Sequence, residues 1–263
     1  MKLFDTHEHL NSIDYFPDFD EVIKRAKEIG VDKMMVVGFS KETNKEALKL
    51  SSLYKGLYPT CGYHPSEVNI ISLNEAREEL IYYLDNKMIY AIGECGMDYH
   101  YTKEDKDLQE LFFRMQIELS YKYNIPLIIH MRDATEDTLN ILIDEYKKHA
   151  KREYLGVMHC YSGSLESMKQ FLKLGFYISF GGPLTYKNSK VVKECLINAP
   201  IDKILIETDS PFLPPSKKRG LRNEPMNVLD VAIEVANLKN ITLVEACEIT
   251  YNNACKLFNI KEE

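Results

Sequence analysis

The sequence has no apolar run that approaches the ~18 residues of a membrane-spanning helix. Its first residues reach polar side chains by Asp5, too soon for the apolar core of a secretory signal peptide. Positive charge is also scarce: Lys and Arg number 33 against 40 Asp and Glu, a formal net charge of −7. A protein that coats nucleic acid or an anionic membrane would carry the opposite sign, so any affinity for phosphate must be local. We therefore expect a cytoplasmic protein that binds no membrane.

Cysteine pairs typical of disulfide frameworks or thiolate metal sites are absent too. None of the six cysteines belongs to a C-x-x-C pair, and most lie within apolar runs, which is typical of reduced, buried thiols. Cys160 follows a histidine, and we interpret it as a packed residue at a strand end rather than a nucleophile. The chain also lacks a linker or low-complexity segment, so we expect one domain over residues 1–263.

Short apolar runs rich in β-branched residues alternate with helical patterns along the whole chain. One strand-helix unit takes roughly 33 residues, and such repetition predicts a parallel sheet. Eight units favour a closed (β/α)8 TIM barrel over an open doubly wound sheet. Two further helices are expected from about Asn227 and Leu243. The eight expected strands span residues 2–7, 33–39, 57–61, 88–93, 126–130, 154–159, 176–180 and 203–208.

Side chains that can bind a metal fall at the ends of these expected strands. Two of them, His7 and His9, are two residues apart and so project to the same side of a strand. The carboxyl ends of barrel strands meet on one face, so ligand-type residues there gather in one pocket. The sequence therefore predicts a metal site there. The residues are His7 and His9, His64 after the third strand, and Glu94, His130, His159 and Asp209 at the ends of the fourth, fifth, sixth and eighth strands.

The donor types limit the identity and number of the metal ions. Imidazole and carboxylate without thiolate suit Zn²⁺, Mn²⁺, Fe²⁺ or Ni²⁺, and Mg²⁺ fits if water and substrate phosphate supply further oxygens. A single catalytic zinc takes three protein ligands, so the larger set favours two divalent ions bridged by Glu94. With Glu94 and Asp209 ionised, about two positive charges would remain to attract an anionic substrate. Asp5 and Glu207 are expected to orient the imidazoles.

Seven motifs around these residues resemble the TatD-type metal-dependent deoxyribonucleases, a family of amidohydrolase-like TIM barrels. The resemblance covers nearly the whole chain, with small departures at Asn11 and Met97, where the family often has Asp and usually Leu. The motifs are DTHEHL at 5–10, GYHP at 62–65, GECGMDY at 93–99, PLIIHMR at 126–132, HCYSG at 159–163, ETDSPFL at 207–213 and RNEP at 222–225. The resemblance implies one metal at His7, His9, Glu94 and Asp209, a second at Glu94, His130 and His159, and His64 at the substrate.

The resemblance also implies a function. It suggests a magnesium-dependent 3′ to 5′ exonuclease that cleaves phosphodiester bonds of single-stranded DNA, or RNA, with an activated water. In our mechanistic hypothesis, Asp209 accepts the proton of that water. The phosphate oxygens would be held by His64, Arg132 and Arg222, because the planar guanidinium fork binds oxyanions at two points. Aromatic side chains in or near the same loops could stack on bases: Tyr63, Tyr99, Tyr101, Tyr161 and Phe212.

Two other interpretations remain open at this point. A metal-dependent deacylase or amidohydrolase, acting on a carboxylic ester, lactone or amide such as an aminoacyl-tRNA ester, would use the same barrel and the same metals. The irregular stretch 210–226 contains Lys217, Lys218, Arg219 and Arg222, and as a loop on the catalytic face it favours phosphate. A metal-binding scaffold without turnover is disfavoured because the proposed ligands and His64 are all present. No obligate protein partner is evident.

Overall fold

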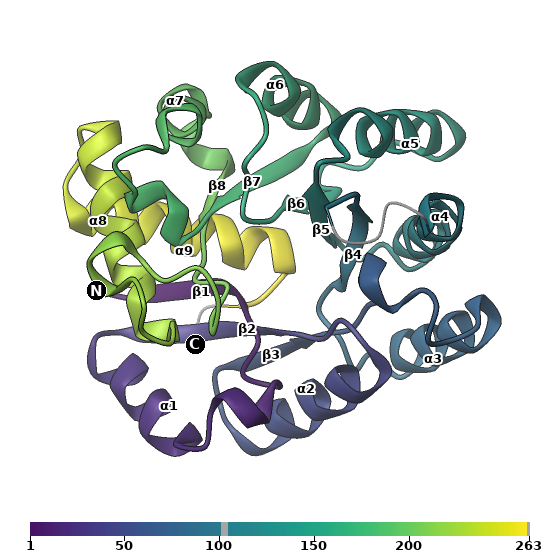
Figure 1. Ribbon diagram of the computed structural model, residues 1–263, viewed down its shortest axis with the longest axis horizontal. Helices are drawn as coiled ribbons and strands as arrows, with labels where there is room; N and C mark the ends of the chain where they lie inside the picture. The colour runs from purple at the N-terminus through teal and green to yellow at the C-terminus, as the bar shows by residue number, and fades with distance from the viewer. Residues whose placement is uncertain (101–104, 262–263) are drawn as a thin grey trace.

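The computed structural model describes residues 1–100 and 105–261. Over these residues parallel strands alternate with helices, and Figure 1 shows the helices surrounding the strands. This confirms the predicted (β/α)8 fold. The strands are β1 Leu3–Glu8, β2 Val31–Val37, β3 Leu57–Thr60, β4 Ile92–Asp98, β5 Leu127–Arg132, β6 Gly156–Met158, β7 Phe176–Phe180 and β8 Ile204–Ile206. The helices are α1 Phe19–Glu28, α2 Lys41–Leu53, α3 Leu73–Asp85, α4 Lys106–Tyr123, α5 Thr135–Lys148, α6 Leu165–Leu174, α7 Lys190–Asn198, α8 Val228–Lys239 and α9 Leu243–Phe258.

The ring of strands consists of two sheets that meet at two seams. Hydrogen bonds order β1 to β3 in one sheet and β4 to β8 in the other. A single parallel bridge joins Cys61 to Ile92 at one seam, and another joins Glu8 to Ser210 at the other. At the second seam the Asp209 N–H also donates to the His7 carbonyl oxygen at 2.8 Å. The expected site residues His7 and Asp209 are thus linked by backbone hydrogen bonding.

Two apolar clusters fill the two sides of the strands. Successive side chains of a strand point to opposite sides, so Leu127 and Ile129 of β5 pack toward the helices while Ile128 points away from them. Ile128 belongs to a cluster that takes buried residues from six of the strands together with Tyr251 and Phe258 of α9. Figure 1 shows α9 crossing behind the strands, so it packs on one end of the barrel. The opposite end is available for polar side chains.

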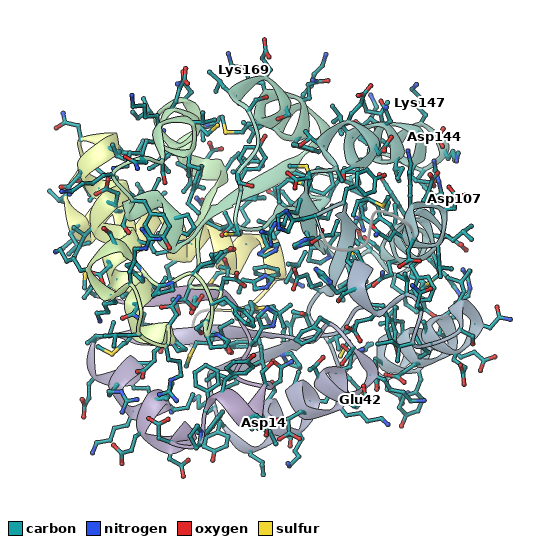
Figure 2. All side chains as sticks on the ribbon, viewed as in Figure 1. Asp14, Glu42, Asp107, Asp144, Lys147 and Lys169 are labelled. Carbon is teal, nitrogen blue, oxygen red and sulfur yellow. The ribbon has the colours of Figure 1, made fainter. Side chains whose placement is uncertain are left out.

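Local sequence signals account for several helix boundaries. The side chains of Ser40, Ser72 and Thr242 each accept a hydrogen bond from the backbone N–H of the residue three positions on. The side chain of that residue in turn accepts the backbone N–H of the Ser or Thr, which forms a capping box. Gly175 ends α6 in the left-handed conformation that glycine adopts without strain. Over the described parts of the chain, none of the helices combines the length and apolar character needed to cross a bilayer. In Figure 2 the labelled charged residues, such as Asp144 and Lys169, lie at the outer edge of the molecule.

Two strands that carry site residues each have a register shift against a neighbour, where three steps of one strand oppose two of the other. Along β1, Asp5 pairs with Met34 of β2 and Glu8 pairs with Val36, so three steps of one strand oppose two of the other. Such a bulge changes which side chains face inward. Thr6 therefore reaches Ser179 and the Ile206 carbonyl, and the adjacent His7 also faces side chains of other strands. The sequence pattern alone predicts strict alternation and misses this shift.

The second bulge lies in β4 and corrects the expected end of that strand. Ile92 pairs with Leu127 and Cys95 with Ile129, again three steps against two. The strand runs on to Asp98, so Glu94 lies inside β4 rather than at its end. Gly93 has φ +151°, and a Cβ there would lie 2.6 Å from the Ile128 carbonyl oxygen, so this position requires glycine. In contrast, β8 ends at Ile206, and Asp209 lies in the following loop.

Candidate metal centre

The structure brings the six predicted metal ligands together at the carboxyl end of the barrel. His7 lies in β1 with His9 just beyond it, Glu94 lies in β4, and His130 lies in β5. His159 follows β6 directly, and Asp209 follows β8. Except for His130, which is partly buried, each has less than a tenth of its surface exposed. The cluster is therefore assembled from five strands and largely shielded from water.

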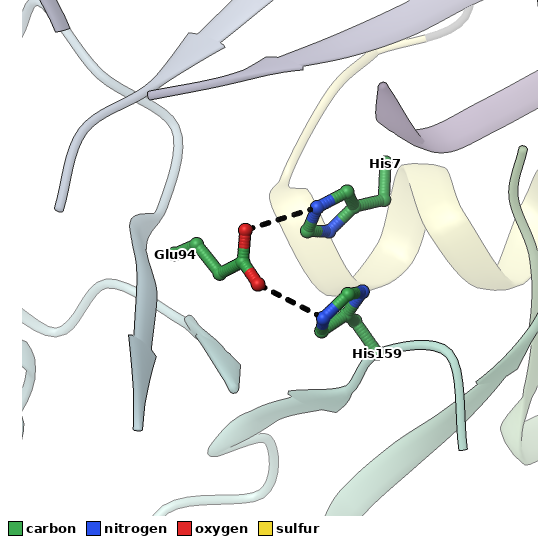
Figure 3. A group of neighbouring side chains, drawn as sticks. All are labelled: His7, Glu94 and His159. Carbon is green, nitrogen blue, oxygen red and sulfur yellow. Dashed lines mark ion pairs between the residues drawn. The ribbon is translucent and has the colours of Figure 1, made fainter. Parts of the chain in front are cut away.

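Glu94 lies at the centre of this group. Its Oε1 is 3.0 Å from His130 Nδ1 and 3.0 Å from His159 Nε2. Its Oε2 is 3.4 Å from His7 Nε2 and 3.5 Å from His9 Nε2. Figure 3 shows His7 and His159 facing the two oxygens from the same side. Each oxygen of this carboxylate thus lies close to one pair of histidines, the arrangement expected of a bridging ligand.

Asp209 completes one half of the group. Its Oδ1 lies 3.7 Å from His7 Nε2 and 3.5 Å from His9 Nε2, and the two imidazole nitrogens are 3.1 Å apart. Among the described residues, three sets of side chains each place one donor atom per residue within 4.8 Å of the others. These sets are His7, His9 and Asp209; His7, Glu94 and His159; and His64, Glu94 and His130. Nitrogen and carboxylate oxygen converging in this way form a donor set that fits divalent metal ions.

The far side of three imidazoles supports the same interpretation. His9 Nδ1 lies 2.9 Å from the Val37 carbonyl oxygen, which can only accept, so the ring proton is on Nδ1. His130 Nε2 lies 2.9 Å from Asp98 Oδ2, and His159 Nδ1 lies 3.3 Å from Glu207 Oε1. In its neutral form, each ring that donates outward in this way leaves the lone pair of its other nitrogen facing the cluster. Metal-binding histidines are characteristically held by such outer acceptors.

Charge within the cluster keeps both carboxylates ionised. Burial by itself raises the pKa of Glu94, but the charge of His159 and the bond from His130 hold that pKa well below its ordinary value. Asp209 is likewise buried, yet contact with His9 and the charge of His7 lower its pKa. For His159, burial opposes protonation while Glu94 and Glu207 raise its pKa well above the usual value. The two negative charges thus require positive charge close by, which a divalent cation would also provide.

His64 borders this cluster from the loop after β3. Its Nε2 is 3.7 Å from Glu94 Oε1, and its ring meets that of His130 edge to face at 4.4 Å between centroids. The Ser66 backbone N–H donates to His64 Nδ1 at 3.1 Å, so the neutral ring carries its proton on Nε2. Burial, with the nearby His130, lowers the pKa of His64 to about 3. At neutral pH His64 therefore points an N–H donor into the site.

The outer carboxylates agree with the sequence prediction only in part. Glu207 contacts His159 as expected and also accepts the Cys160 backbone N–H at 2.7 Å. Asp5 does not contact an imidazole nitrogen in the structure: it accepts bonds from Thr208 and from the His7 backbone N–H, and so holds backbone in place. The expected role of Asp5 in orienting a ring is therefore corrected. Asp98 supports His130 and is absent from the predicted site, although it lies within the GECGMDY motif, which is the sequence signal for it.

The two predicted phosphate-binding arginines differ in their surroundings. Arg132 ends β5 two residues after His130 and is exposed. Arg222 instead donates to Asp18 at 2.6 Å, to Glu224 at 2.8 Å and to the Tyr15 carbonyl oxygen at 2.8 Å. Its guanidinium is thus already occupied in linking a loop to α1. We therefore withdraw Arg222 from the expected phosphate contacts.

A (β/α)8 barrel with a buried group of imidazoles and carboxylates at its carboxyl end is the architecture of a metal-dependent hydrolase. The chain belongs to the family described as TatD related DNase, which matches residues 4–259.

Proteins of known sequence or structure match this chain over nearly its full length. It is 45% identical over 261 residues to YabD of Bacillus subtilis, an uncharacterized metal-dependent hydrolase, covering 98% of this chain and 99% of YabD. It is 34% identical to the similarly described YcfH of Escherichia coli K12, covering 99% and 97%. The crystal structure of YJJV, a TatD homologue from the same species, superposes with a TM-score of 0.90 at 28% identity and 98% coverage of both chains. The phosphotriesterase homology protein of E. coli shares the fold, with a TM-score of 0.70 at 14% identity and 98% coverage of both chains.

Proposed function

We propose that this metal-dependent hydrolase is a nuclease that removes nucleotides from the 3′ end of single-stranded DNA, with RNA as a further substrate. The observation that carries the proposal is the Glu94-centred group of imidazoles and carboxylates, which suits hydrolysis of an anionic ester. Membership of a family described as TatD related DNase supports a nucleic-acid substrate.

Two divalent ions would be held by these side chains, with Glu94 between them. His7, His9 and Asp209 would hold one ion, and His130 and His159 the other. When bound, such ions polarise the scissile phosphoryl group and stabilise charge on the leaving oxygen. Mg²⁺ is our preferred ion for function, and the nitrogen donors also suit Zn²⁺, Mn²⁺, Ni²⁺ or Fe²⁺.

The remaining steps fall to individual side chains. The Asp209 carboxylate, kept ionised by the neighbouring histidines, accepts the proton of the attacking water at a carboxylate oxygen. His64 donates its Nε2–H to a phosphate oxygen, because Nδ1 is occupied by the Ser66 N–H. Arg132, exposed at the end of β5, binds a second phosphate oxygen. The burial of the cluster limits access of bulk water to the reacting group.

Degradation of an oligonucleotide tests the proposal. Metal-stripped protein is refilled with Mg²⁺, Mn²⁺ or Zn²⁺ and incubated with a single-stranded oligonucleotide labelled at its 5′ end. We expect metal-dependent shortening from the 3′ end, and the most effective ion identifies the working metal. The Asp209→Asn variant should lose about 100- to 10,000-fold in rate, the range expected for loss of a general base. Thermal unfolding of that variant shows whether it is still folded.

Other outcomes would change the assignment. If folded, metal-loaded protein leaves the oligonucleotide intact but hydrolyses p-nitrophenyl carboxyl esters, the deacylase interpretation replaces the nuclease. Glu94→Ala protein prepared in the same way is the control for a contaminating nuclease. If that control is inactive, wild-type activity in the folded Asp209→Asn variant would remove Asp209 from the mechanism.

A further inference from the structure

Exposed aromatic rings at the edge of the metal centre are fewer than the sequence suggested. Tyr63 and Tyr161 are only 1% and 3% exposed, so their rings are core. Tyr99 is partly buried and donates its hydroxyl to Asp137 at 2.6 Å. Tyr101 lies outside the described residues. Of the five aromatics expected to stack on bases, Phe212 is the one that the described structure places with an exposed ring, at 44%.

Phe212 lies directly beside the metal centre. Its ring centroid is 6.1 Å from that of His9, with 64° between the ring planes. Tyr15, which is 53% exposed and which the sequence had not indicated, lies 5.7 Å from Phe212 at 68°. Both neighbours meet Phe212 at steep angles, and neither lies parallel to it as a stacked ring would. The two exposed rings form an apolar corner next to a candidate ligand.

The backbone beneath Phe212 is held firmly. Asn223 is fully buried, and its Nδ2 donates to the Phe212 carbonyl oxygen at 2.7 Å and to the Thr208 carbonyl oxygen at 2.8 Å. The Phe212 N–H donates to the Asp209 carbonyl oxygen at 2.8 Å. These bonds fix the backbone of Phe212 relative to Asp209. Two exposed aromatic rings in contact with each other, on a backbone held beside a polar site, offer an apolar surface to a ligand there.

We infer that Phe212 and Tyr15 form a stacking subsite for the nucleobase next to the scissile phosphodiester. The inference rests on the proposed nuclease function. A nucleobase offers a flat face to an aromatic ring whatever its identity, so the subsite would accept any sequence. His9 lies near Phe212 through its ring contact, and Asp209 lies near it through the hydrogen-bonded turn from Asp209 to Phe212. With the base against Phe212, the adjoining phosphate therefore lies toward His9 and Asp209. The subsite thus favours a nucleotide end over an ester without a planar group.

The test compares a base with its absence at one position. Two 5′-labelled oligonucleotides differ only at the 3′-terminal nucleotide, which is normal in one and abasic in the other. Phe212→Leu keeps an apolar side chain but removes the flat ring, and we expect its KM for the normal substrate to rise about tenfold. The KM for the abasic substrate should change less than about twofold, because no base is present to stack. Phe212→Tyr keeps the ring and should behave as wild type toward both substrates. Tyr82→Leu, a change of an exposed aromatic in α3, is the matched control.

The outcomes separate this inference from the proposed function. Equal effects of Phe212→Leu on both substrates, or no effect on either, would overturn the stacking subsite while leaving the nuclease in place. If wild-type protein cleaves neither substrate, the nuclease proposal fails, and binding decides the subsite. For that purpose the 3′-terminal base is replaced by 2-aminopurine, whose fluorescence falls on stacking. Asp209→Asn protein should quench the fluorescence, and the double variant that also carries Phe212→Leu should not; this result supports the subsite. Equal quenching by the single and the double variant contradicts it.

Discussion

Glu207 is the buried residue on which the position of His159 depends. Its side chain is almost fully shielded from solvent, and its Oε1 accepts hydrogen bonds from His159 Nδ1 and from the Cys160 backbone N–H. Cys160 has a left-handed backbone, φ +41°, which a residue other than glycine adopts only when its surroundings hold it there. Glu207 therefore fixes both the ring of a candidate ligand and the turn that carries it.

We predict that Glu207→Gln weakens metal binding without unfolding the protein. The amide oxygen can still accept a bond, but its negative charge is lost, so the outward N–H of His159 is held less strongly. Metal affinity should fall by about 10- to 100-fold, the range found for outer partners of metal ligands. Competition with a metal-sensitive dye measures the affinity. Glu234→Gln, which removes a surface partner of Lys193, should leave it unchanged. Affinity within about twofold of wild type for Glu207→Gln would contradict this role.

At the scale of elements, the loop between β8 and α8 carries fewer available cations than its sequence suggests. Arg222 pairs with Asp18 and Glu224, and Arg25 of α1 binds the same two carboxylates. Asp18 is 204 residues away from Arg222, so no local pattern reveals the contact. Arg219 lies over the ring of Tyr186 at 5.1 Å. These basic residues join the loop to neighbouring elements, and the loop keeps Asp209 and Phe212 in place.

The Asp18–Arg222–Glu224 group makes a pH-dependent contribution to stability. Hydrogen bonds from Arg222 and Arg25 lower the pKa of Asp18. Burial alone would raise the pKa of Glu224, but bonds from the same two arginines outweigh it, so the pKa of Glu224 is also lowered. A carboxyl whose pKa is lower in the folded state stabilises the fold at pH values above its ordinary pKa. That stabilisation is lost as the pH falls toward the folded-state value. It should therefore be complete at pH 7 and decline below about pH 4.

We predict that Arg222→Ala lowers the free energy of unfolding by about 1–2 kcal/mol at pH 7. For a chain of this size the melting temperature should fall by about 2–8 °C. The difference from wild type should narrow as the pH falls below about 4, because wild-type protein then protonates the same carboxylates. Thermal unfolding followed by circular dichroism at pH values from about 3 to about 8 measures both the lower stability and its dependence on pH. Lys217→Ala removes a charge from the same loop outside this group and is the control. A difference that stays constant across the range would exclude the electrostatic origin.

At the scale of the molecule, the periodic pattern was sufficient for the barrel and for the placement of most ligands. The order of strands and helices follows from alternating apolar runs, and histidines at strand ends converge because parallel strands share a direction. The bulges in β1 and β4 were not predictable, because an extra residue is defined only against the neighbouring strand. The same holds for the contact of Arg222 with Asp18, which lies 204 residues away in the chain. Patterns along the chain thus locate the site, and contacts across the barrel determine its details.

The candidate ligands also come from both sheets of the barrel. His7 lies in β1 of the three-stranded sheet with His9 just beyond it, whereas Glu94 lies in β4 of the five-stranded sheet and His159 directly follows β6 of that sheet. Between β1 and the segment after β8 the sheets are joined by the single Glu8–Ser210 bridge and neighbouring backbone bonds. Ions bound between these residues would link the two sheets across that seam. Any ligand that binds only the folded state also stabilises it by mass action.

We therefore predict that metal loading raises the melting temperature. At an ion concentration about 100 times the dissociation constant, binding adds about 2.7 kcal/mol to the free energy of unfolding. That corresponds to a shift of about 5–10 °C for a chain of this length. Differential scanning calorimetry of metal-stripped and refilled protein measures the shift. Asp209→Asn, which replaces one charged donor, should show a smaller shift, whereas Tyr82→Leu on the outer surface should match wild type. If stripped and refilled wild-type protein melt at the same temperature while binding is saturated, the unfolded chain binds the ions as tightly as the folded one, which would contradict a site that forms only on folding.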